Sequence, residues 1–208
     1  MTKDFYGREF FVGSDVLIPR LETEAAIDLA LSLAGKPYLP GLKVPERRLP
    51  ARPRILDVGT GSGCIATTLK LELEEAEVFA CDISDSALEV AKQNARALGA
   101  SVSFLKSDLL KDIEGNFDLV VANLPYVDRT WDWLDLKSLA KEPELALFAE
   151  DGGLKLIKSL LDEALHRTKF LILEADPCQH EKILAYNEHY RLIKTSGFQL
   201  LFRVLGEC

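Results

Sequence analysis

The chain has 208 residues, of which 48% are hydrophobic and 28% are charged, the composition of one globular domain. Its formal net charge is −8. Proteins that hold a nucleic-acid backbone through many phosphate contacts usually carry the opposite sign, so the charge disfavours tight nucleic-acid binding.

The spacing of cysteines and histidines predicts no metal site. The four cysteines include no C-x-x-C pair, and the three histidines lack the spacing of metal ligands. Cys64 and Cys81 lie in apolar stretches and are expected to be reduced core residues of a cytoplasmic protein. Charges interrupt residues 1–11, and no run approaches the roughly 18 apolar residues of a membrane span, so we expect neither a signal peptide nor a membrane helix.

The first quarter of the chain predicts an extension, a helix and a connector within a single domain of residues 1–208. We expect residues 1–20 to form an N-terminal β-hairpin extension, and residues 22–33 have the pattern of an amphipathic helix. Residues 35–53 contain five prolines. Because this density prevents a helix or a central strand, the segment is expected to be an exposed connector.

Short, mainly apolar runs then recur, as expected for strands buried on both faces of a sheet. They are residues 55–58, 78–83, 102–105, 117–122 and 170–173. Helical patterns lie between them: Ser84 can cap a helix that stops at Gly99, and residues 151–166 place apolar side chains at helical spacing. This alternation predicts a doubly wound parallel sheet with right-handed crossovers.

The end of the chain departs from that alternation. Residues 190–195 and 199–205 are β-rich, and only residues 196–198 separate them. So short a link cannot make a crossover, and the last strand must be antiparallel. A parallel sheet closed by an antiparallel hairpin distinguishes methyltransferases from most nucleotide-binding relatives. We therefore expect an α/β fold of the class I methyltransferase type, with a Rossmann-like, doubly wound, seven-stranded sheet.

A glycine-rich turn after the first long strand is the best candidate for a ligand site. Its glycines are Gly59, Gly61 and Gly63, which differs from the G-x-G-x-x-G spacing of dinucleotide sites. Asp57 stands just before the turn, where its carboxylate would repel a pyrophosphate but suit a cation. S-adenosylmethionine carries a sulfonium and an ammonium group and no phosphate, so it is the expected cofactor.

Two further acidic residues follow strands at the same edge. Asp82 ends the second strand, 19 residues after Gly63, where an acid accepts the two ribose hydroxyls of such a ligand. Asp108 follows the third strand and is placed either to meet the adenine amino group or to remain a solvated strand-end carboxylate.

The fourth strand ends in Asn123, Leu124, Pro125 and Tyr126, a polar–proline–aromatic turn. The side-chain oxygen of Asn123 and the carbonyl of Leu124 can accept both hydrogen bonds of a planar –NH2 group, on which Tyr126 can stack. Methyl transfer depends mainly on holding nitrogen and methyl carbon ~3–3.5 Å apart, so no histidine base is required. The turn predicts a methyl-acceptor site. In residues 127–141, Trp131 and Trp133 are expected to pack, with contact to the acceptor as the alternative.

Together these motifs resemble the HemK or PrmC family, the glutamine N5-methyltransferases that modify peptide-chain release factors. The resemblance extends over residues 5–207. It is carried by V-L-I-P-R-L-E-T-E at 16–24, the glycine turn, D-I-S at 82–84, S-D-L at 107–109 and E-P-E-L-A-L at 142–147.

The resemblance implies a cofactor site, an acceptor site and a protein substrate. The implied cofactor-binding residues are Gly59, Thr60, Gly61, Ser62, Gly63, Asp82, Ile83, Leu109 and Asn123, with Glu22 and Thr23 closing over them. Residues 123–126 would hold a glutamine side chain in a glycine-flanked loop of a release factor, with Asn123, Pro125 and Tyr126 at the catalytic centre.

Three departures from the family keep two alternatives open. Leu124 and Leu21 stand where the family has proline, and the helical N-terminal domain of typical bacterial members is not expected in this chain. The first alternative is an enzyme that methylates a base amino group of RNA or DNA, as adenine-N6 methyltransferases do. The second is a non-catalytic cofactor-binding subunit.

Overall fold

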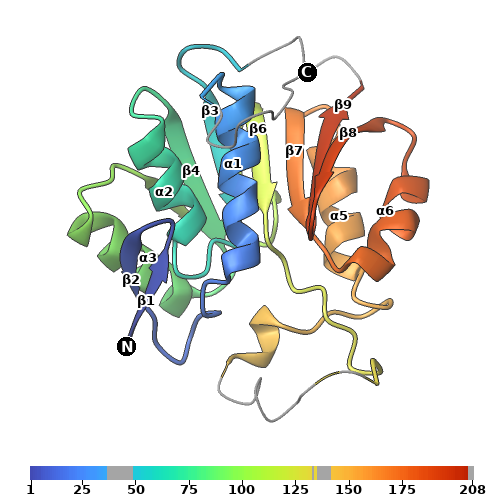
Figure 1. The fold of residues 1–208 in the computed structure, drawn as a ribbon, viewed down its shortest axis with the longest axis horizontal. Coiled ribbons are helices and arrows are strands. Elements are labelled where there is room, and N and C mark those ends of the chain that lie inside the picture. The colour runs from blue at the N-terminus through green and yellow to red at the C-terminus, as the bar shows by residue number, and fades with distance from the viewer. Residues whose placement is uncertain (37–48, 133, 135–141, 206–208) are drawn as a thin grey trace.

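The computed structural model describes residues 1–36, 49–132, 134 and 142–205, and its centre is a seven-stranded sheet (Figure 1). The strand order is β5-β4-β3-β6-β7-β9-β8. The strands are β3 (Arg54–Val58), β4 (Glu77–Asp82), β5 (Ser103–Lys106), β6 (Phe117–Ala122), β7 (Thr168–Glu174), β8 (Tyr190–Ser196) and β9 (Gln199–Val204). β3 to β7 are mutually parallel, and β9 is antiparallel to both β7 and β8, which confirms the predicted fold class.

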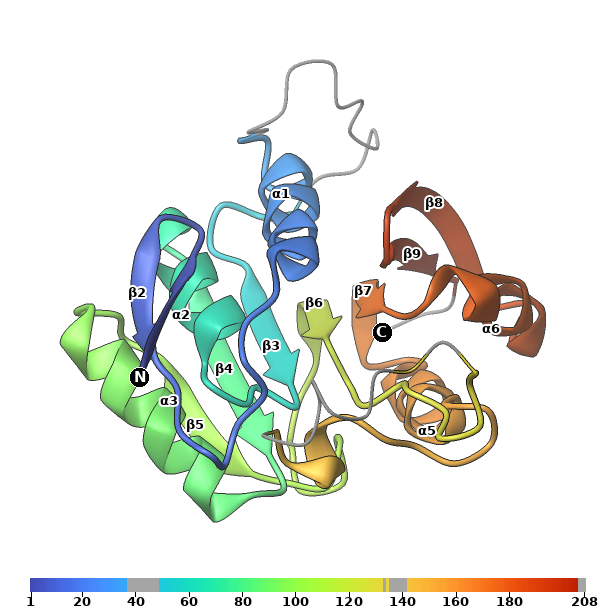
Figure 2. The same ribbon diagram turned by 60° about the horizontal axis from the view of Figure 1, so that its bottom comes forward.

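Helices cover both faces of this sheet (Figures 1 and 2). On one face lie α1 (Glu24–Leu33), α2 (Cys64–Glu72) and α3 (Asp85–Ala97), and on the other lie α5 (Lys155–Ala164) and α6 (His180–Tyr186). Short 3-10 helices are η1 (Leu21–Thr23), η2 (Glu144–Ala146) and η3 (Pro177–Gln179). No helix in the described ranges is long and apolar enough to cross a membrane.

Alternation along the buried strands divides the core into two layers. In β6, Leu119 and Val121 pack toward α1 and α2, whereas Val120 and Ala122 pack toward α5. Both faces are apolar because both are covered, which is why these strands appear in the sequence as nearly continuous apolar runs.

The predicted helix ends were correct for α3 and wrong for α5. Ser84 caps α3 by accepting a hydrogen bond from the backbone N–H of Ala87 at 3.2 Å. The helix expected over 151–166 is shorter, because Asp151 and the two glycines after it have positive φ, as does His166 beyond the other end. Left-handed residues cannot continue a right-handed helix. The turn between β8 and β9 is also tighter than expected, since Ser196 still pairs with Gln199.

The N-terminal hairpin, β1 (Thr2–Phe5) and β2 (Arg8–Phe11), is a separate two-stranded sheet that packs against α3 (Figure 2). Asn94 of α3 exchanges two hydrogen bonds with the backbone of Phe11, at 2.8 and 2.9 Å, and donates a third to the Ser62 carbonyl at 2.9 Å. One buried amide thus connects the hairpin to the glycine turn. Most of the expected connector, residues 37–48, lies outside the described residues.

Gly63 is the N-cap of α2, with a φ of 77°. A Cβ atom at this position would lie 2.9 Å from the Cβ of Ala91 in α3, so α2 and α3 can approach each other only over a glycine.

We expect Gly63→Ala to lower the free energy of unfolding by about 1–3 kcal/mol more than Gly99→Ala. Gly99 is the matched control because its φ is 73° and a Cβ there would meet no atom within 4 Å, so both variants share the backbone strain and only Gly63→Ala adds the clash. Urea denaturation of both variants measures the difference; equal losses would contradict the contact with Ala91.

Candidate active site

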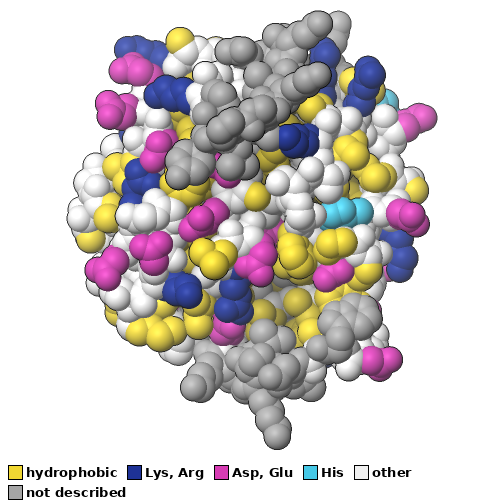
Figure 3. All heavy atoms as spheres, viewed as in Figure 1, with side chains coloured by type: hydrophobic (Ala, Val, Ile, Leu, Met, Phe, Trp, Pro, Cys, Tyr) yellow, Lys and Arg dark blue, Asp and Glu magenta, His cyan; other side chains and the backbone are white. Residues whose placement is uncertain are grey.

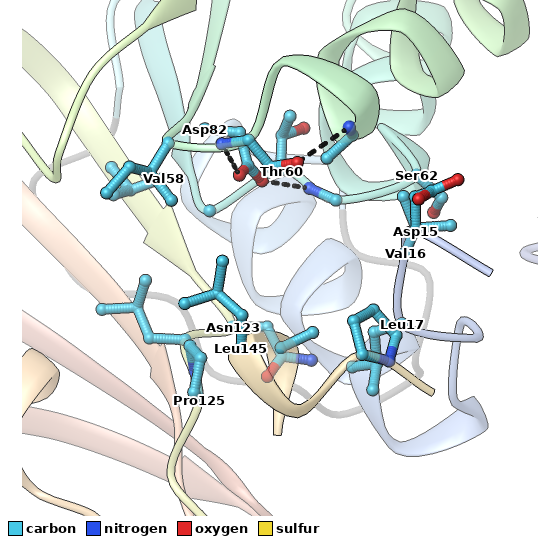
Figure 4. A pocket seen from close by; sticks show the side chains of 18 of the residues that line it. Asp15, Val16, Leu17, Val58, Thr60, Ser62, Asp82, Asn123, Pro125 and Leu145 are labelled. Carbon is cyan, nitrogen blue, oxygen red and sulfur yellow. Dashed lines mark hydrogen bonds between the residues drawn. The ribbon is translucent and has the colours of Figure 1, made fainter. Parts of the chain in front are cut away.

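A cavity of about 290 Å³ opens at the carboxyl ends of β3, β4 and β6. Figure 4 shows Val58, Thr60 and Asp82 on one side of it and Asn123 and Pro125 on another. Parallel α/β sheets bind ligands at this edge, where loops and helix N-termini converge. Every residue expected to bind or cover the cofactor lines this cavity except Asp57, Gly63 and Glu22, and Glu22 is exposed at the surface. Those that line it are Thr23, Gly59, Thr60, Gly61, Ser62, Asp82, Ile83, Asp108, Leu109 and Asn123.

Asp82 is held with both carboxylate oxygens in fixed positions. One oxygen accepts the backbone N–H of Gly61 and the other accepts that of Ser84, both at 2.9 Å. A carboxylate oxygen can accept more than one hydrogen bond, so each retains capacity for a ligand in the cavity. The arrangement suits two neighbouring hydroxyl groups, and Figure 4 shows the two backbone contacts as dashed lines.

Asp57 lies beneath the glycine turn rather than in the cavity wall. It is fully buried, and one oxygen accepts the Thr60 hydroxyl at 2.6 Å and the Ala66 N–H at 3.2 Å, while Oδ1 has no partner among the described residues. Burial raises the pKa of Asp57 to about 7, against the lowering effect of these two hydrogen bonds. Asp57 therefore shapes the turn and places an acidic group behind it, which favours a cation in the cavity.

We expect Asp57→Asn to alter how stability depends on pH. The unfolded Asp57 loses its proton near its ordinary pKa of 3.8 and the folded one only near 7, so the wild type loses stability as pH rises across this window. The loss relative to Asp57→Asn should be on the order of 2–4 kcal/mol and should level off above about pH 7. Thermal unfolding of the ligand-free protein at several pH values measures it, and parallel curves for the two proteins would contradict the buried acid.

Residues 14–20, apart from Ile18, line one side of the cavity, and we call this stretch the covering segment; Figure 4 labels Asp15, Val16 and Leu17 on it. Glu142 fixes this segment: it accepts the Ile18 N–H at 3.0 Å and forms an ion pair with Arg20 at 2.5 Å. The Glu142 side chain is 4% exposed. Arg20 and Glu142 lie in the motifs at 16–24 and 142–147, but no role was predicted for either, because only the folded chain shows that these two opposite charges meet.

Replacement of Glu142 by Gln should release the covering segment and weaken binding of S-adenosylmethionine about tenfold or more, as expected for the loss of a buried, charge-assisted contact. Glu144→Gln is the matched control, because Glu144 pairs with Arg129 at the surface and does not line the cavity. Calorimetry measures the affinity of both variants for S-adenosylmethionine. Equal affinities would contradict the role of Glu142 in holding the covering segment.

Two of the residues expected in the site, Asp108 and Gly63, have contacts away from the cavity. Asp108 lines the cavity and also forms an ion pair with Lys111 at the surface. Gly63 does not line the cavity; it lies at the contact between α2 and α3.

A second cavity of about 220 Å³ adjoins the first. Asn123 and Leu124 line both cavities, Pro125 lines the first, and Tyr126 lines the second. Trp131 lines the second cavity as well, whereas Trp133 lies outside the described residues. The turn at 123–126 is thus the wall that the two cavities share.

Gln179 and Gly153 hold the turn at residues 123–126 in place. Gln179 donates to the Tyr126 carbonyl and to the Gly152 carbonyl, both at 2.8 Å. Gly153 passes so close that a Cβ atom there would lie 1.9 Å from the Tyr126 carbonyl oxygen. Only glycine fits, because its φ is also 81°. Sequence reasoning missed Gln179 and Gly153, for which composition gave no specific signal.

The half-buried Tyr126 and the buried Glu174 define the chemistry of the second cavity. Burial and the negative charge of Glu174 raise the pKa of the Tyr126 phenol, so it remains neutral and cannot serve as a base at ordinary pH. Burial also raises the pKa of Glu174, while hydrogen bonds from Thr23, Gln199 and Tyr126 lower it. Glu174 was not predicted, because it continues an apolar strand without a turn motif.

The strand order, with the antiparallel β9 inserted between β7 and β8, and the ligand cavity at the carboxyl ends of the central strands define an α/β protein of the class I methyltransferase fold. The chain belongs to the methyltransferase small domain family, whose model matches residues 42–156.

Several curated relatives are named release factor glutamine methyltransferase. A release factor glutamine methyltransferase of Koribacter versatilis is 41% identical over 170 residues, covering 80% of this chain and 56% of the relative. One of Chlorobaculum tepidum is 43% identical over 156 residues, covering 71% of this chain and 50% of the relative. The chain thus spans about half the length of the curated relatives it matches.

Solved structures resemble the fold. A T. thermophilus 16S rRNA methyltransferase in complex with AdoMet and guanosine matches with a TM-score of 0.64 and 17% identity, covering 99% of this chain and 50% of that chain. At this identity the likeness concerns the fold alone.

Proposed function

We propose that this protein transfers a methyl group from S-adenosylmethionine to the side-chain amide nitrogen of a glutamine in a peptide-chain release factor. The observation that carries the proposal is the junction of the two cavities at Asn123, between the glycine turn and Tyr126. The relatives named release factor glutamine methyltransferase support the choice of substrate. A release factor acts in translation termination at the ribosome, so the proposal includes a cytoplasmic location.

The first cavity fits S-adenosylmethionine. Asp82 would accept the ribose hydroxyls, Ile83 and Leu109 offer apolar surface to the adenine, and the buried Asp57 favours the cationic end. When bound, the cofactor supplies an electrophilic methyl group on its sulfonium. Residues of the covering segment would lie against the bound cofactor and shield it from water on one side.

The second cavity fits a primary amide. Within the described structure the Asn123 side-chain oxygen has no hydrogen-bond partner, so it and the Leu124 carbonyl can accept the two N–H groups of the amide. Tyr126 would cover one face of the planar group, and its neutral phenol leaves this work to position rather than to proton transfer. Orientation of this kind can supply much of the reduction of the barrier.

The surface charge supports a protein substrate more than a nucleic acid. The net charge is −8, which gives little general attraction for phosphates. Acidic and basic side chains are interspersed over the coloured part of the face in Figure 3 rather than gathered by sign.

Two substitutions should separate the cavities by function. Asp82→Ala should weaken cofactor affinity by ~1.5–3 kcal/mol through the loss of charge-assisted hydrogen bonds. Tyr126→Ala should leave cofactor affinity within about twofold of the wild type and lower turnover, because Tyr126 lines only the second cavity. Calorimetry and initial rates measure both quantities; if both variants lost cofactor binding equally, the division into two sub-sites would fail.

The substrate is tested by mass spectrometry after incubation with labelled cofactor and a panel of release factors and RNAs. We expect one added methyl group on a glycine-flanked loop glutamine, and none with Asn123→Ala. Label found only in RNA or DNA would instead support a base-amino methyltransferase, and cofactor binding without any transfer would support a non-catalytic subunit.

A further inference from the structure

One face of α3 contacts both the glycine turn and the N-terminal part of the chain (Figure 2). Four residues at helical spacing form this face: Ala87, Val90, Ala91 and Asn94. The first two are buried in one cluster with Val12 and with Val16 of the covering segment. The third lies against Gly63 at the start of α2. The glycine turn and the entry to the covering segment therefore pack on the same face of one helix.

The Asn94 side chain connects these two parts of the chain directly. It is 3% exposed. Its oxygen accepts the Phe11 N–H at 2.8 Å, and its nitrogen donates to the Phe11 carbonyl and to the Ser62 carbonyl, both at 2.9 Å. An amide nitrogen has two hydrogens, and each of them is used on a different segment. The opposite orientation would set the amide oxygen against two carbonyls, so these partners determine how the amide is turned.

Both segments that Asn94 connects lead into the cofactor cavity, whereas Asn94 itself does not line it. Ser62 lines the cavity, and Phe11 lies just before the covering segment. Figure 4 shows Ser62 and Val16 on the same side of the pocket. Asn94 can therefore influence a bound cofactor only through the segments that it holds.

The turn of the N-terminal hairpin is held by different contacts. The backbone N–H of Tyr6 donates to Glu24 at 2.7 Å, and Arg8 forms an ion pair with Glu72 at 2.5 Å. These contacts reach α1 and α2, and none of these four described residues lines either cavity. The hairpin can thus be loosened at its turn without a change to any contact of the glycine turn, which provides a matched control.

We propose that Asn94 is a positioning residue for S-adenosylmethionine: its amide holds Ser62 of the glycine turn and the start of the covering segment at a fixed separation, and so preorganises the cavity. This inference rests on the cofactor site of the proposed function and not on its acceptor. Without the amide, the carbonyls of Phe11 and Ser62 lose their donor, and the cofactor itself must order the two segments. The apparent affinity then falls with the fraction of molecules in which the site is already formed.

Asn94→Asp retains the shape of the side chain and an acceptor for the Phe11 N–H but removes both donors. We expect it to weaken binding of S-adenosylmethionine about tenfold, because two buried carbonyls lose their partner. Asn94→Leu removes all three hydrogen bonds without adding a charge and should weaken binding at least as much. Glu72→Gln, the control at the hairpin turn, should bind within about twofold of the wild type.

Calorimetry, performed well below the unfolding temperature of each variant, measures these affinities. Wild-type affinity in both Asn94 variants would overturn the proposal, and so would a loss of the same size in Glu72→Gln.

Kinetics distinguish positioning of the cofactor from a merely structural role. The KM for S-adenosylmethionine should rise in Asn94→Asp, while kcat at saturating cofactor and the KM of the acceptor stay within about twofold of the wild type. The reason is that neither residue bonded by Asn94 lines the second cavity. A lower thermal stability with an unchanged KM for the cofactor would show that Asn94 only stabilises the fold.

Hydrogen exchange tests the connection in the ligand-free protein. In Asn94→Leu the backbone amides of Phe11 and of Gly61 in the glycine turn should both exchange faster, because the two segments are released together. Glu72→Gln should speed exchange at residues 6–8 and leave Gly61 unchanged. Faster exchange at Phe11 alone would show that Asn94 holds only the hairpin, and the proposal would then be wrong.

The wild-type control separates this inference from the proposed function. If the wild type binds S-adenosylmethionine but methylates no amide, the proposed function fails, and the affinities of the Asn94 variants still decide the positioning role. If the wild type methylates a glutamine and the Asn94 variants bind the cofactor equally well, only the positioning role fails. A wild type that does not bind S-adenosylmethionine would overturn both.

Discussion

Parallel hydrogen bonding of β3 with β4 and β6, and of β6 with β7, brings the carboxyl ends of four strands to one edge of the sheet. The register pairs Val58 with Cys81 and Ala122, and Ala122 with Leu173. The next residue of each strand therefore lies at the same level. This row consists of Gly59, Asp82, Asn123 and Glu174. The cavities and the turn between them exist because four residues distant in sequence leave the sheet side by side.

The sequence predicted the members of this row that turn sharply away from their strands. Gly59, Asp82 and Asn123 each follow an apolar run and introduce a turn or a charge, so the patterns at the strand ends were visible. Glu174 has no such signal, because its contacts with Tyr126 and Gln199 form only in the folded chain. The burial of Asp57 was likewise invisible, since a strand residue next to a turn can face either the ligand or the core.

Leu124 shows how a departure from the expected proline is accommodated. Its side chain is 4% exposed and packs against the glycine turn, where a Cβ atom at Gly59 would lie 2.9 Å from Leu124 Cδ2. A branched apolar side chain thus fills the space between the two turns of the site. The backbone of residues 123–126 is held by the hydrogen bond from Gln179 to the Tyr126 carbonyl and by the close approach of Gly153.

The covering segment belongs to both cavities. Leu17 and Arg20 line both, so a ligand in either cavity lies against the same stretch of chain. The ion pair of Arg20 with Glu142 joins residues 122 positions apart and holds this stretch, so a change to that one contact is felt in both cavities at once.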